Sequence, residues 1–204
     1  MKVSCTPRVL LLALPLLILL GACASTGSHR PDSHLSAKLT PFTYYDEGDL
    51  LFIGVDTRAA QYISDESIFP LGIALVNKTL KSMTIDRESF VLEDDNGKRY
   101  PLVSHKEYRA SYRRSKTDEQ LADNFIEAMR GRFATFSYRE LRMFPATSRR
   151  STTSTSAVEV RRRQMVVGYV YFPVPENGLH KRDLKLLFKV EEQPETFVVR
   201  FSIR

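Results

Sequence analysis

Short runs in which apolar and polar residues alternate constrain the fold of this chain more than any other feature. Two of them lie near the end of the chain: Leu184, Leu186, Phe188 and Val190, then Phe197, Val199, Phe201 and Ile203. Successive side chains of a β-strand point to opposite faces, so each run predicts a strand with one face in a core and one in water. The alternation therefore indicates antiparallel β-structure.

Further β-like runs precede these two and are separated by turn-forming residues. They cover residues 42–45, 50–57, 69–77, 82–86, 89–94, 98–103 and 165–175. Asn96-Gly97 lies between two of them, and both residues tolerate the positive φ of a type I′ turn, which predicts a β-hairpin. The neighbouring acidic residues do not indicate a calcium loop, because no glutamate closes a twelve-residue frame that begins at Asp94.

Residues 117–133 have a helical period. An apolar residue recurs at every fourth position: Leu121, Phe125 and Met129. Thr117 with Gln120 matches a capping box, and Gly131 is the predicted end of the helix. The apolar face of this helix is expected to pack on the sheet, with binding to a partner as the alternative. Periodicity does not decide between strand and helix for residues 133–144.

The first 22 residues have the three zones of an export signal. Lys2 and Arg8 precede an apolar run at 9–20, and small residues then lead to Cys23. As a helix this run would span ~18 Å, well short of the ~30 Å hydrocarbon core of a bilayer. A permanent transmembrane helix is therefore not predicted.

The segment Leu20-Gly21-Ala22-Cys23 resembles the lipobox of bacterial lipoproteins. The resemblance implies that the Cys23 thiol receives a diacylglyceryl group and that a signal peptidase cuts before it. Two or more acyl chains anchor a protein stably, so the mature chain would stay on a membrane outside the cytoplasm. Ala24 stands where an aspartate would favour the inner membrane in enterobacterial lipoproteins, which implies the outer membrane, facing the periplasm. An ordinary secretory signal with a coincidental cysteine is the alternative.

Cysteine content and charge exclude several classes of function. Only Cys5 and Cys23 occur, so the mature chain has no internal disulfide, no cysteine zinc site and no free thiol nucleophile. Removal of the signal leaves 28 basic and 24 acidic residues, a net charge of +4, because Lys2 and Arg8 leave with it. This mild excess suits an anionic membrane surface and does not indicate nucleic-acid binding.

The mature chain is expected to form a lipidated, flexible tether at 23–41 and one β-rich domain at 42–204. Residues 24–40 contain almost no large apolar side chains and cannot repay the entropy of ordering. His29 and His34 flank Asp32 in this tether, but an unfolded segment does not hold ligand geometry, so no metal site is predicted.

Three segments resemble the immunoglobulin-like, telokin-like domains of a family of bacterial lipoproteins: residues 73–79, 89–102 and 166–178. In that family an asparagine ends an early strand, a Phe-x-Leu strand leads to an acidic hairpin, and a Gly-x-x-x-Phe-x-x-Pro strand follows. With the strand pattern, the resemblance implies a mainly β fold, an immunoglobulin-like antiparallel β-sandwich. Residues 104–157 depart from the family as a long, helix-containing insertion, and such insertions on β scaffolds often carry function.

The Ser/Thr-rich composition of residues 145–157 predicts a loop. Five arginines lie within or just after it: Arg149, Arg150, Arg161, Arg162 and Arg163. They are candidates for contact with anionic lipid or lipid A phosphates. Each such charge near a membrane surface contributes ~1 kcal/mol to the free energy of binding. A solvated strand edge that discourages aggregation is the alternative. Asn77, in an Asn-Lys-Thr sequence, is interpreted as the end of a strand rather than a glycosylation acceptor.

No motif indicates catalysis or a cofactor: the chain has no Gly-rich phosphate loop, no Gly-x-Ser-x-Gly and no His-Glu-x-x-His. A Ser-His-Asp triad would have to use His105 or His180. We therefore expect a non-enzymatic interaction or assembly module that contacts an envelope protein or glycan. One alternative is a carrier of a small ligand or lipid, because nine Tyr and twelve Phe could line a cavity between sheets. A hydrolase centred on His105 is a further alternative. The insertion also holds other residues that could be recruited for acid-base chemistry, although their spacing does not demand it: Tyr108, Tyr112, Asp118 and Glu119.

Overall fold

Strands account for most of the regular structure in the part of the chain that the computed structural model describes, residues 35–63, 66–145 and 155–203. The strands are β1 (Ala37–Thr40), β2 (Thr43–Glu47), β3 (Leu51–Asp56), β4 (Ile68–Asn77), β5 (Ser82–Asp86), β6 (Phe90–Glu93), β7 (Arg99–Pro101), β8 (Ser137–Glu140), β9 (Ala157–Arg161), β10 (Gln164–Pro173), β11 (Asp183–Phe188) and β12 (Phe197–Ser202). The helices are the 3₁₀ turn η1 (Ala59–Tyr62), α1 (His105–Ser111) and α2 (Ser115–Arg132).

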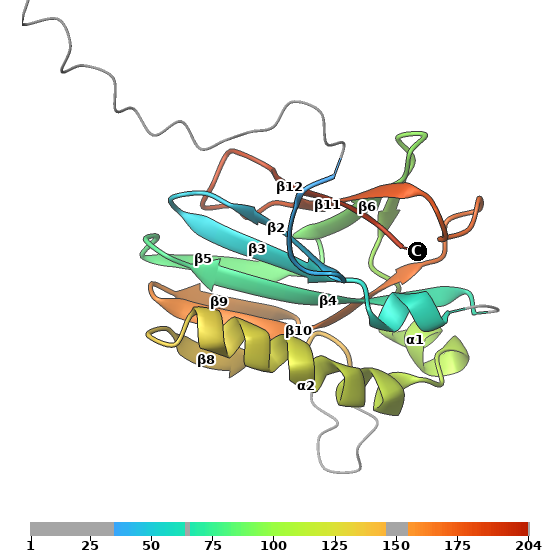
Figure 1. Ribbon diagram of the computed structural model, residues 1–204, viewed down its shortest axis with the longest axis horizontal. Helices are drawn as coiled ribbons and strands as arrows, with labels where there is room; N and C mark the ends of the chain where they lie inside the picture. Colours follow the sequence, from blue (N-terminus) through green and yellow to red (C-terminus); the bar gives the residue numbers. More distant parts are fainter. Residues whose placement is uncertain (1–34, 64–65, 146–154, 204) are drawn as a thin grey trace, which may run out of the picture. The chain divides into compact units, whose positions relative to one another are not determined.

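These strands form three sheets (Figure 1). The largest has the order β1-β2-β3-β4-β10-β8, the second has the order β12-β11-β6-β7, and β5 pairs with β9. Paired strands are antiparallel except β8 and β10, which run parallel. The prediction of a mainly β, antiparallel sandwich with a helical insertion is confirmed, and the strand runs lie where the alternation placed them.

The main core lies between the six-stranded and the four-stranded sheet. Side chains from the inner faces of both sheets are buried there, among them Ile53, Ile73, Val170, Phe90, Leu186 and Phe201. Strand β11 alternates between buried and more exposed positions, as its sequence predicts. Full burial of one such side chain stabilises the fold by ~1.5–3 kcal/mol, so this core accounts for much of the stability.

Helix α2 covers the opposite, outer face of the six-stranded sheet. Phe125 and Met129 of α2 pack there against Phe52, Val76 and Val167. This second layer explains why every residue of β3 and β4 is buried, although antiparallel strands often have one wet face. The prediction that the apolar face of the helix packs on the sheet is confirmed.

The ends of α2 differ from those predicted. The helix begins at Ser115, and its N-cap is Arg114 rather than Thr117, which lies inside the first turn. Burial of the Ser115 and Asp118 side chains fixes this earlier start. Gly131 does not end the helix, because the chain continues until the Phe133 N–H bonds to the carbonyl of Met129.

The hairpin between β6 and β7 is confirmed, but its turn is longer than a two-residue type I′ turn. Glu93 pairs with Arg99, so five residues connect the strands, and Gly97 adopts a φ of 78°. Asp94 accepts hydrogen bonds from the Asn96 and Lys98 backbone N–H groups. The acidic residue thus orders the turn through hydrogen bonds to its backbone.

The predicted tether was too long at its C-terminal end. Residues 37–40 form β1, which pairs with β2, and the Ser36 N–H donates to the carbonyl of Arg200. Main-chain hydrogen bonds to an otherwise open sheet edge order this polar segment, which its composition does not reveal. The signal segment, Cys23, His29 and His34 lie outside the described residues.

The insertion at 104–157 is integrated into the domain rather than appended to it. Its second half adds β8 to the six-stranded sheet, which resolves the ambiguity of residues 133–144. Its first half contains α1, which the periodicity did not predict and which starts with a capping box of Ser104 and Glu107. Within the described ranges, no helix has the length and apolar character needed to cross a membrane.

Candidate functional site

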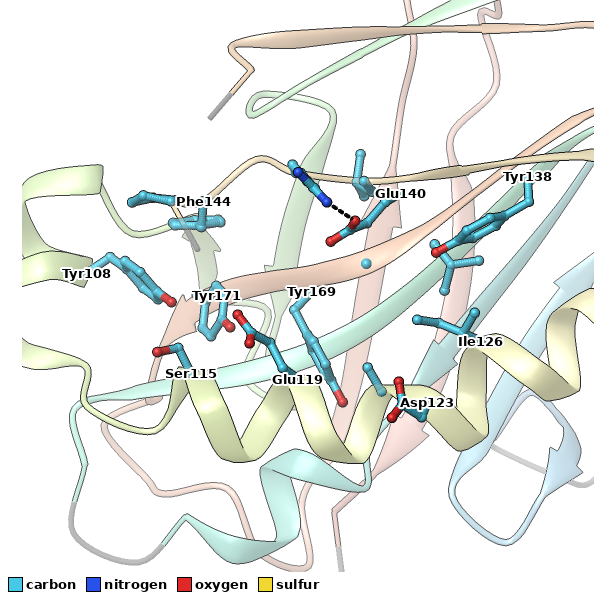
Figure 2. Close-up of a pocket in the computed structure, with 16 residues that line it drawn as sticks. Tyr108, Ser115, Glu119, Asp123, Ile126, Tyr138, Glu140, Phe144, Tyr169 and Tyr171 are labelled. Carbon is cyan, nitrogen blue, oxygen red and sulfur yellow. Dashed lines mark hydrogen bonds and ion pairs between the residues drawn. The ribbon is translucent and has the colours of Figure 1, made fainter. Parts of the chain in front are cut away.

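A groove of about 380 Å³ lies between the N-terminal half of α2 and the outer face of β10 (Figure 2). Strand β8 and the segment 141–145 form its far wall. Its lining combines aromatic rings with carboxylates: Tyr108, Tyr138, Phe144, Tyr169 and Tyr171, and Glu119, Asp123 and Glu140. Grooves of this volume, with polar groups set among aromatic walls, are typical of ligand sites.

Gly168 allows the far wall to form. The segment after β8 crosses β10 so closely that a Cβ at position 168 would lie 2.9 Å from the Leu141 Cβ and would also clash with the Leu141 carbonyl oxygen. The Leu141 N–H donates to the carbonyl of Val167, which holds the crossing in place. A side chain at position 168 would therefore push the wall away from the sheet.

Four aromatic rings close one end of the groove. The Tyr171 ring lies 4.6 Å from that of Tyr108, 4.9 Å from Tyr112 and 4.9 Å from Phe144, measured between ring centroids. Each ring is buried. Tilted and edge-on pairs of this kind contribute ~0.5–1.5 kcal/mol each beyond their burial, so this end of the groove is preformed.

A buried carboxyl group, that of Asp118, lies beneath these rings. The Tyr112 hydroxyl donates to Asp118 Oδ2 at 2.6 Å, and the Tyr171 hydroxyl donates to the same oxygen at 3.2 Å. Burial raises the pKa of Asp118 to about 6, and the two hydroxyls offset only part of this effect. The carboxyl group therefore changes its charge near pH 6.

Tyr169 lies at the floor of the groove. Figure 2 shows its ring directed from β10 toward α2, between Glu119 and Asp123 in this view. Its hydroxyl is buried and has no hydrogen-bond partner among the described residues. Burial, followed by the charge of Asp56, raises the pKa of this hydroxyl, so it stays protonated. A buried polar atom without a partner is uncommon in a folded protein and needs an explanation.

The carboxylates of Glu119 and Asp123 are exposed at the rim of the groove, one helical turn apart. Within the described part of the chain, neither makes a hydrogen bond or an ion pair. Across the groove, Glu140 accepts from Arg142 at 2.5 Å. The rim therefore carries an excess of negative charge.

The three described arginines of the predicted patch do not line this groove. Arg161, Arg162 and Arg163 are exposed where β9 leads into β10, and Arg163 adopts a φ of 58°. Arg161 forms an ion pair with Glu159 at 3.6 Å. Arg149 and Arg150 lie outside the described residues, and contact of the five arginines with an anionic surface stays a prediction.

Each of the two histidines in the described residues forms a hydrogen bond with a backbone carbonyl oxygen. His105 Nε2 lies 2.8 Å from the carbonyl oxygen of Met143, and His180 Nε2 lies 3.3 Å from that of Ile63. No group of three or more His, Cys, Asp or Glu side chains in residues 35–63, 66–145 and 155–203 could hold a metal ion. Asn77 ends β4 and donates to the carbonyls of Leu80 and Val160, which agrees with its interpretation as a strand-end residue.

The sequence did not reveal the groove, because its lining comes from α1, α2, β8 and β10, which meet only in the fold. The carrier hypothesis placed a cavity between the two sheets, but the groove lies on the opposite face of the six-stranded sheet. One signal was present: Val167, Tyr169 and Tyr171 alternate along β10, and so share its outer face.

No protein-family model matches the chain, and neither does any curated protein. One similar solved structure is the crystal structure of a protein from Bacillus subtilis that is provisionally assigned as a lipoprotein (ycdA). The two chains are 9% identical, with a TM-score of 0.41 over 78% of this chain and 38% of the other. This chain thus spans less than half of that protein. The likeness does not assign the immunoglobulin-like family, which stays an implication of the sequence.

Proposed function

We propose that this chain is a lipid-anchored, non-enzymatic binding module of the bacterial cell envelope. In this proposal Cys23 carries the lipid, the domain faces the periplasm from the outer membrane, and the groove between α2 and β10 is the contact site. The groove is the observation that carries the proposal, since a preformed recess lined by rings and unpaired carboxylates suits binding. The partner is an envelope protein or glycan.

Several contacts support a binding role over a catalytic one. A hydrolase centred on His105 needs that ring to polarise a nucleophile, but its Nε2 is engaged with the backbone of the groove wall. The same holds for His180, whose Nε2 lies against the carbonyl of Ile63. Asp118 lies buried under tyrosines, with no histidine or nucleophile among its hydrogen-bond partners in the described residues.

The exposed arginines supply a second, weaker contact in this proposal. Arg161, Arg162 and Arg163 would approach anionic lipid or lipid A phosphates once the acyl chains hold the domain near a membrane. Replacement of all three by glutamine should weaken the binding of the full chain to vesicles that contain anionic lipid. Binding to neutral vesicles should not change.

The groove is tested by photocrosslinking in living cells. A benzophenone amino acid replaces Tyr138, which lines the groove and is 37% exposed, or Leu50, which is 36% exposed and does not line it. The proposal expects a discrete crosslinked product from position 138 and none from position 50. No product at position 138, or equal products at both, would count against the groove. Deletion of the insertion is a poorer test, because β8 belongs to the sheet.

The anchor has its own test. Cells that express the full chain should incorporate labelled fatty acid into it, and Cys23→Ser should abolish the label and release the protein from the membrane fraction. A Cys23→Ser variant that still fractionates with membranes would contradict a lipid anchor at this position.

A carrier of a small ligand is the second candidate function. The observation that favours it is the groove of about 380 Å³, whose lining residue Tyr169 has a buried hydroxyl without a hydrogen-bond partner in the described residues. Native mass spectrometry of the full chain, extracted in mild detergent, should show a bound mass that Tyr169→Trp removes by filling the recess. Spectra without added mass before and after incubation with envelope extract would speak against this function.

A further inference from the structure

Basic side chains gather at one end of the sandwich, which we call the basic end. Figure 1 shows that the turns between β2 and β3, between β4 and β5, and between β9 and β10 all lie there, together with the C-terminal end of α2. Main-chain hydrogen bonds join two of these turns, since the Arg162 N–H donates to the carbonyl of Lys81. The three turns contain one acidic residue, Asp49.

Ion pairs neutralise only part of the charge at the basic end. Lys78 and Arg132 both bind the Glu47 carboxylate, at 2.7 and 2.6 Å. Arg161 lies 3.6 Å from Glu159. Four further basic residues of this end, the unpaired cations, are exposed and make no ion pair within the described ranges: Lys81, Arg130, Arg162 and Arg163. The basic end therefore keeps an excess of positive charge.

Two features of the unpaired cations lower the stability of the fold. The register of β5 and β9 places Lys81 directly opposite Arg162, whose N–H donates to the Lys81 carbonyl. Like charges directly opposite one another destabilise a pair of strands. Arg163 adopts a φ of 58°, a conformation that glycine or asparagine adopts at lower cost. The chain thus has positive charge at positions where the fold alone would favour other residues, which indicates a role in binding an anion.

A recess of about 440 Å³ lies beside two of the unpaired cations, between the end of α2 and the start of β8. Its lining includes Arg130, Phe136 and Tyr138. The guanidinium of Arg130 lies 5.5 Å from the centroid of the Tyr138 ring, and that of Arg163 lies 5.7 Å from the Phe136 ring. Contact with a ring positions a guanidinium and leaves its N–H groups free to donate to phosphate oxygens.

The course of the chain indicates which anion this end meets. Strand β1 is antiparallel to β2, with Ala37 opposite Tyr45, so β1 runs away from the turn between β2 and β3. The described part of the chain therefore enters the domain from the side of the basic end. Cys23, which carries the lipid in the proposed function, precedes this entry point in the sequence. A lipid attached there would bring membrane phosphates to this end of the domain.

We propose that the basic end docks on the phosphate groups of the anionic bilayer that holds the lipid anchor. Lys81 and Arg162 contact the surface from their turns, and Arg130 and Arg163 donate to phosphate oxygens beside the recess. The anchor raises the local concentration of head groups, so contacts that are weak singly act together. The inference rests on the anchor of the proposed function, and it adds the surface that faces the membrane and the orientation of the domain.

Quenching of tryptophan by lipid head groups measures this orientation, because the chain has no tryptophan of its own. Thr79→Trp places a probe in the exposed turn between β4 and β5. Tyr62→Trp places one in η1, beyond the far end of β3, at a position that is 58% exposed. The full chain is reconstituted through its anchor in vesicles of phosphatidylcholine, with or without phosphatidylglycerol, that carry a spin label on the head group.

With phosphatidylglycerol, quenching at position 79 should exceed that at position 62 by about twofold or more, and in neutral vesicles the two should be equal. Lys81→Gln combined with Arg130→Gln should lower the equilibrium constant for docking about tenfold or more, because two charges near the surface are lost. Lys106→Gln combined with Arg109→Gln removes equal charge from exposed positions of α1 and should have no effect. Lys81→Gln should not lower the melting temperature, since it relieves the repulsion from Arg162.

The outcomes separate this inference from the proposed function. A full chain that does not incorporate labelled fatty acid contradicts the anchor. A labelled chain with equal quenching at positions 79 and 62, or with the same quenching at position 79 in neutral and anionic vesicles, overturns the inference alone. Release of the domain by inorganic phosphate, at an ionic strength at which chloride has no effect, would assign the basic end to free phosphate and would also overturn it.

Discussion

Asp118→Asn should make the stability of this protein less dependent on pH. The carboxyl group of Asp118 is buried under Tyr112 and Tyr171, and burial raises its pKa from 3.8 to about 6. Between these values the folded chain holds a proton that the unfolded chain has lost. The stabilising contribution of the protonated group is therefore fully present below the unfolded pKa, and it is lost as the pH rises through the folded pKa.

The size of the effect follows from these two pKa values. The full loss of stability between low and neutral pH is about 3 kcal/mol, and about 2 kcal/mol of it falls between pH 4.5 and pH 7.5. Asparagine has nearly the same volume, keeps one oxygen that accepts from the tyrosine hydroxyls, and does not titrate. Any constant cost of its NH₂ group shifts the stability of the variant equally at each pH.

Urea unfolding of the full chain in detergent, followed by circular dichroism, measures this effect. The difference in free energy of unfolding between Asp118→Asn and the unchanged protein should move in favour of the variant by about 2 kcal/mol from pH 4.5 to pH 7.5. Other titrating groups cancel in this difference. Glu127→Gln, exposed on the same helix, should give a flat difference. A flat difference for Asp118→Asn as well would refute the view that burial raises the pKa of this group.

Two further changes test the construction of the domain. Gly168→Ala should destabilise the domain by about 3 kcal/mol or more, because the new Cβ meets the backbone of Leu141. Gly131→Ala, in open space on α2, is the control and should stabilise the domain by up to about 1 kcal/mol. Thermal unfolding measures both effects, and a mild effect at position 168 would show that the groove wall moves easily. Asn77→Ala should lower the free energy of unfolding by about 2 kcal/mol or more, because it leaves two backbone carbonyls without their donor. Asn124→Ala, at an exposed position, is the control and should change it little. Similar unfolding midpoints for the two variants would contradict the role given to the buried amide of Asn77.

Local patterns in the sequence were sufficient to predict most of the strands. Alternation and turn residues are properties of neighbouring positions, so strands such as β11 and β12 could be located without knowledge of their partners. The same holds for the body of α2, whose apolar residues repeat every fourth position. The ends of that helix were harder to predict, because contacts of Asp118 and Phe133 with distant parts of the chain fix them.

Elements stabilised by distant main-chain hydrogen bonds were not predicted. Strand β1 has two exposed and two half-buried positions and no apolar pattern, but it completes the edge beside β2. Strand β8 is exposed at each of its four positions and is held by parallel pairing with β10. Side-chain patterns carry no information on such pairing, since a strand at the rim of a sheet need not bury its side chains.

The groove arises because α2 covers the outer face of the six-stranded sheet with two chemically different halves. Its C-terminal half packs through Phe125, Met129 and the adjoining Phe133, an apolar contact sufficient to fix the helix. Its N-terminal half lies over tyrosines and carries a buried carboxyl group, Asp118, whose ionisation destabilises the fold by about 3 kcal/mol at neutral pH. Packing alone would favour an apolar residue at that position. The apolar half of α2 thus offsets the cost of the polar half, and this division is the physical reason why the proposed binding site is the groove beside β10 rather than the sandwich core.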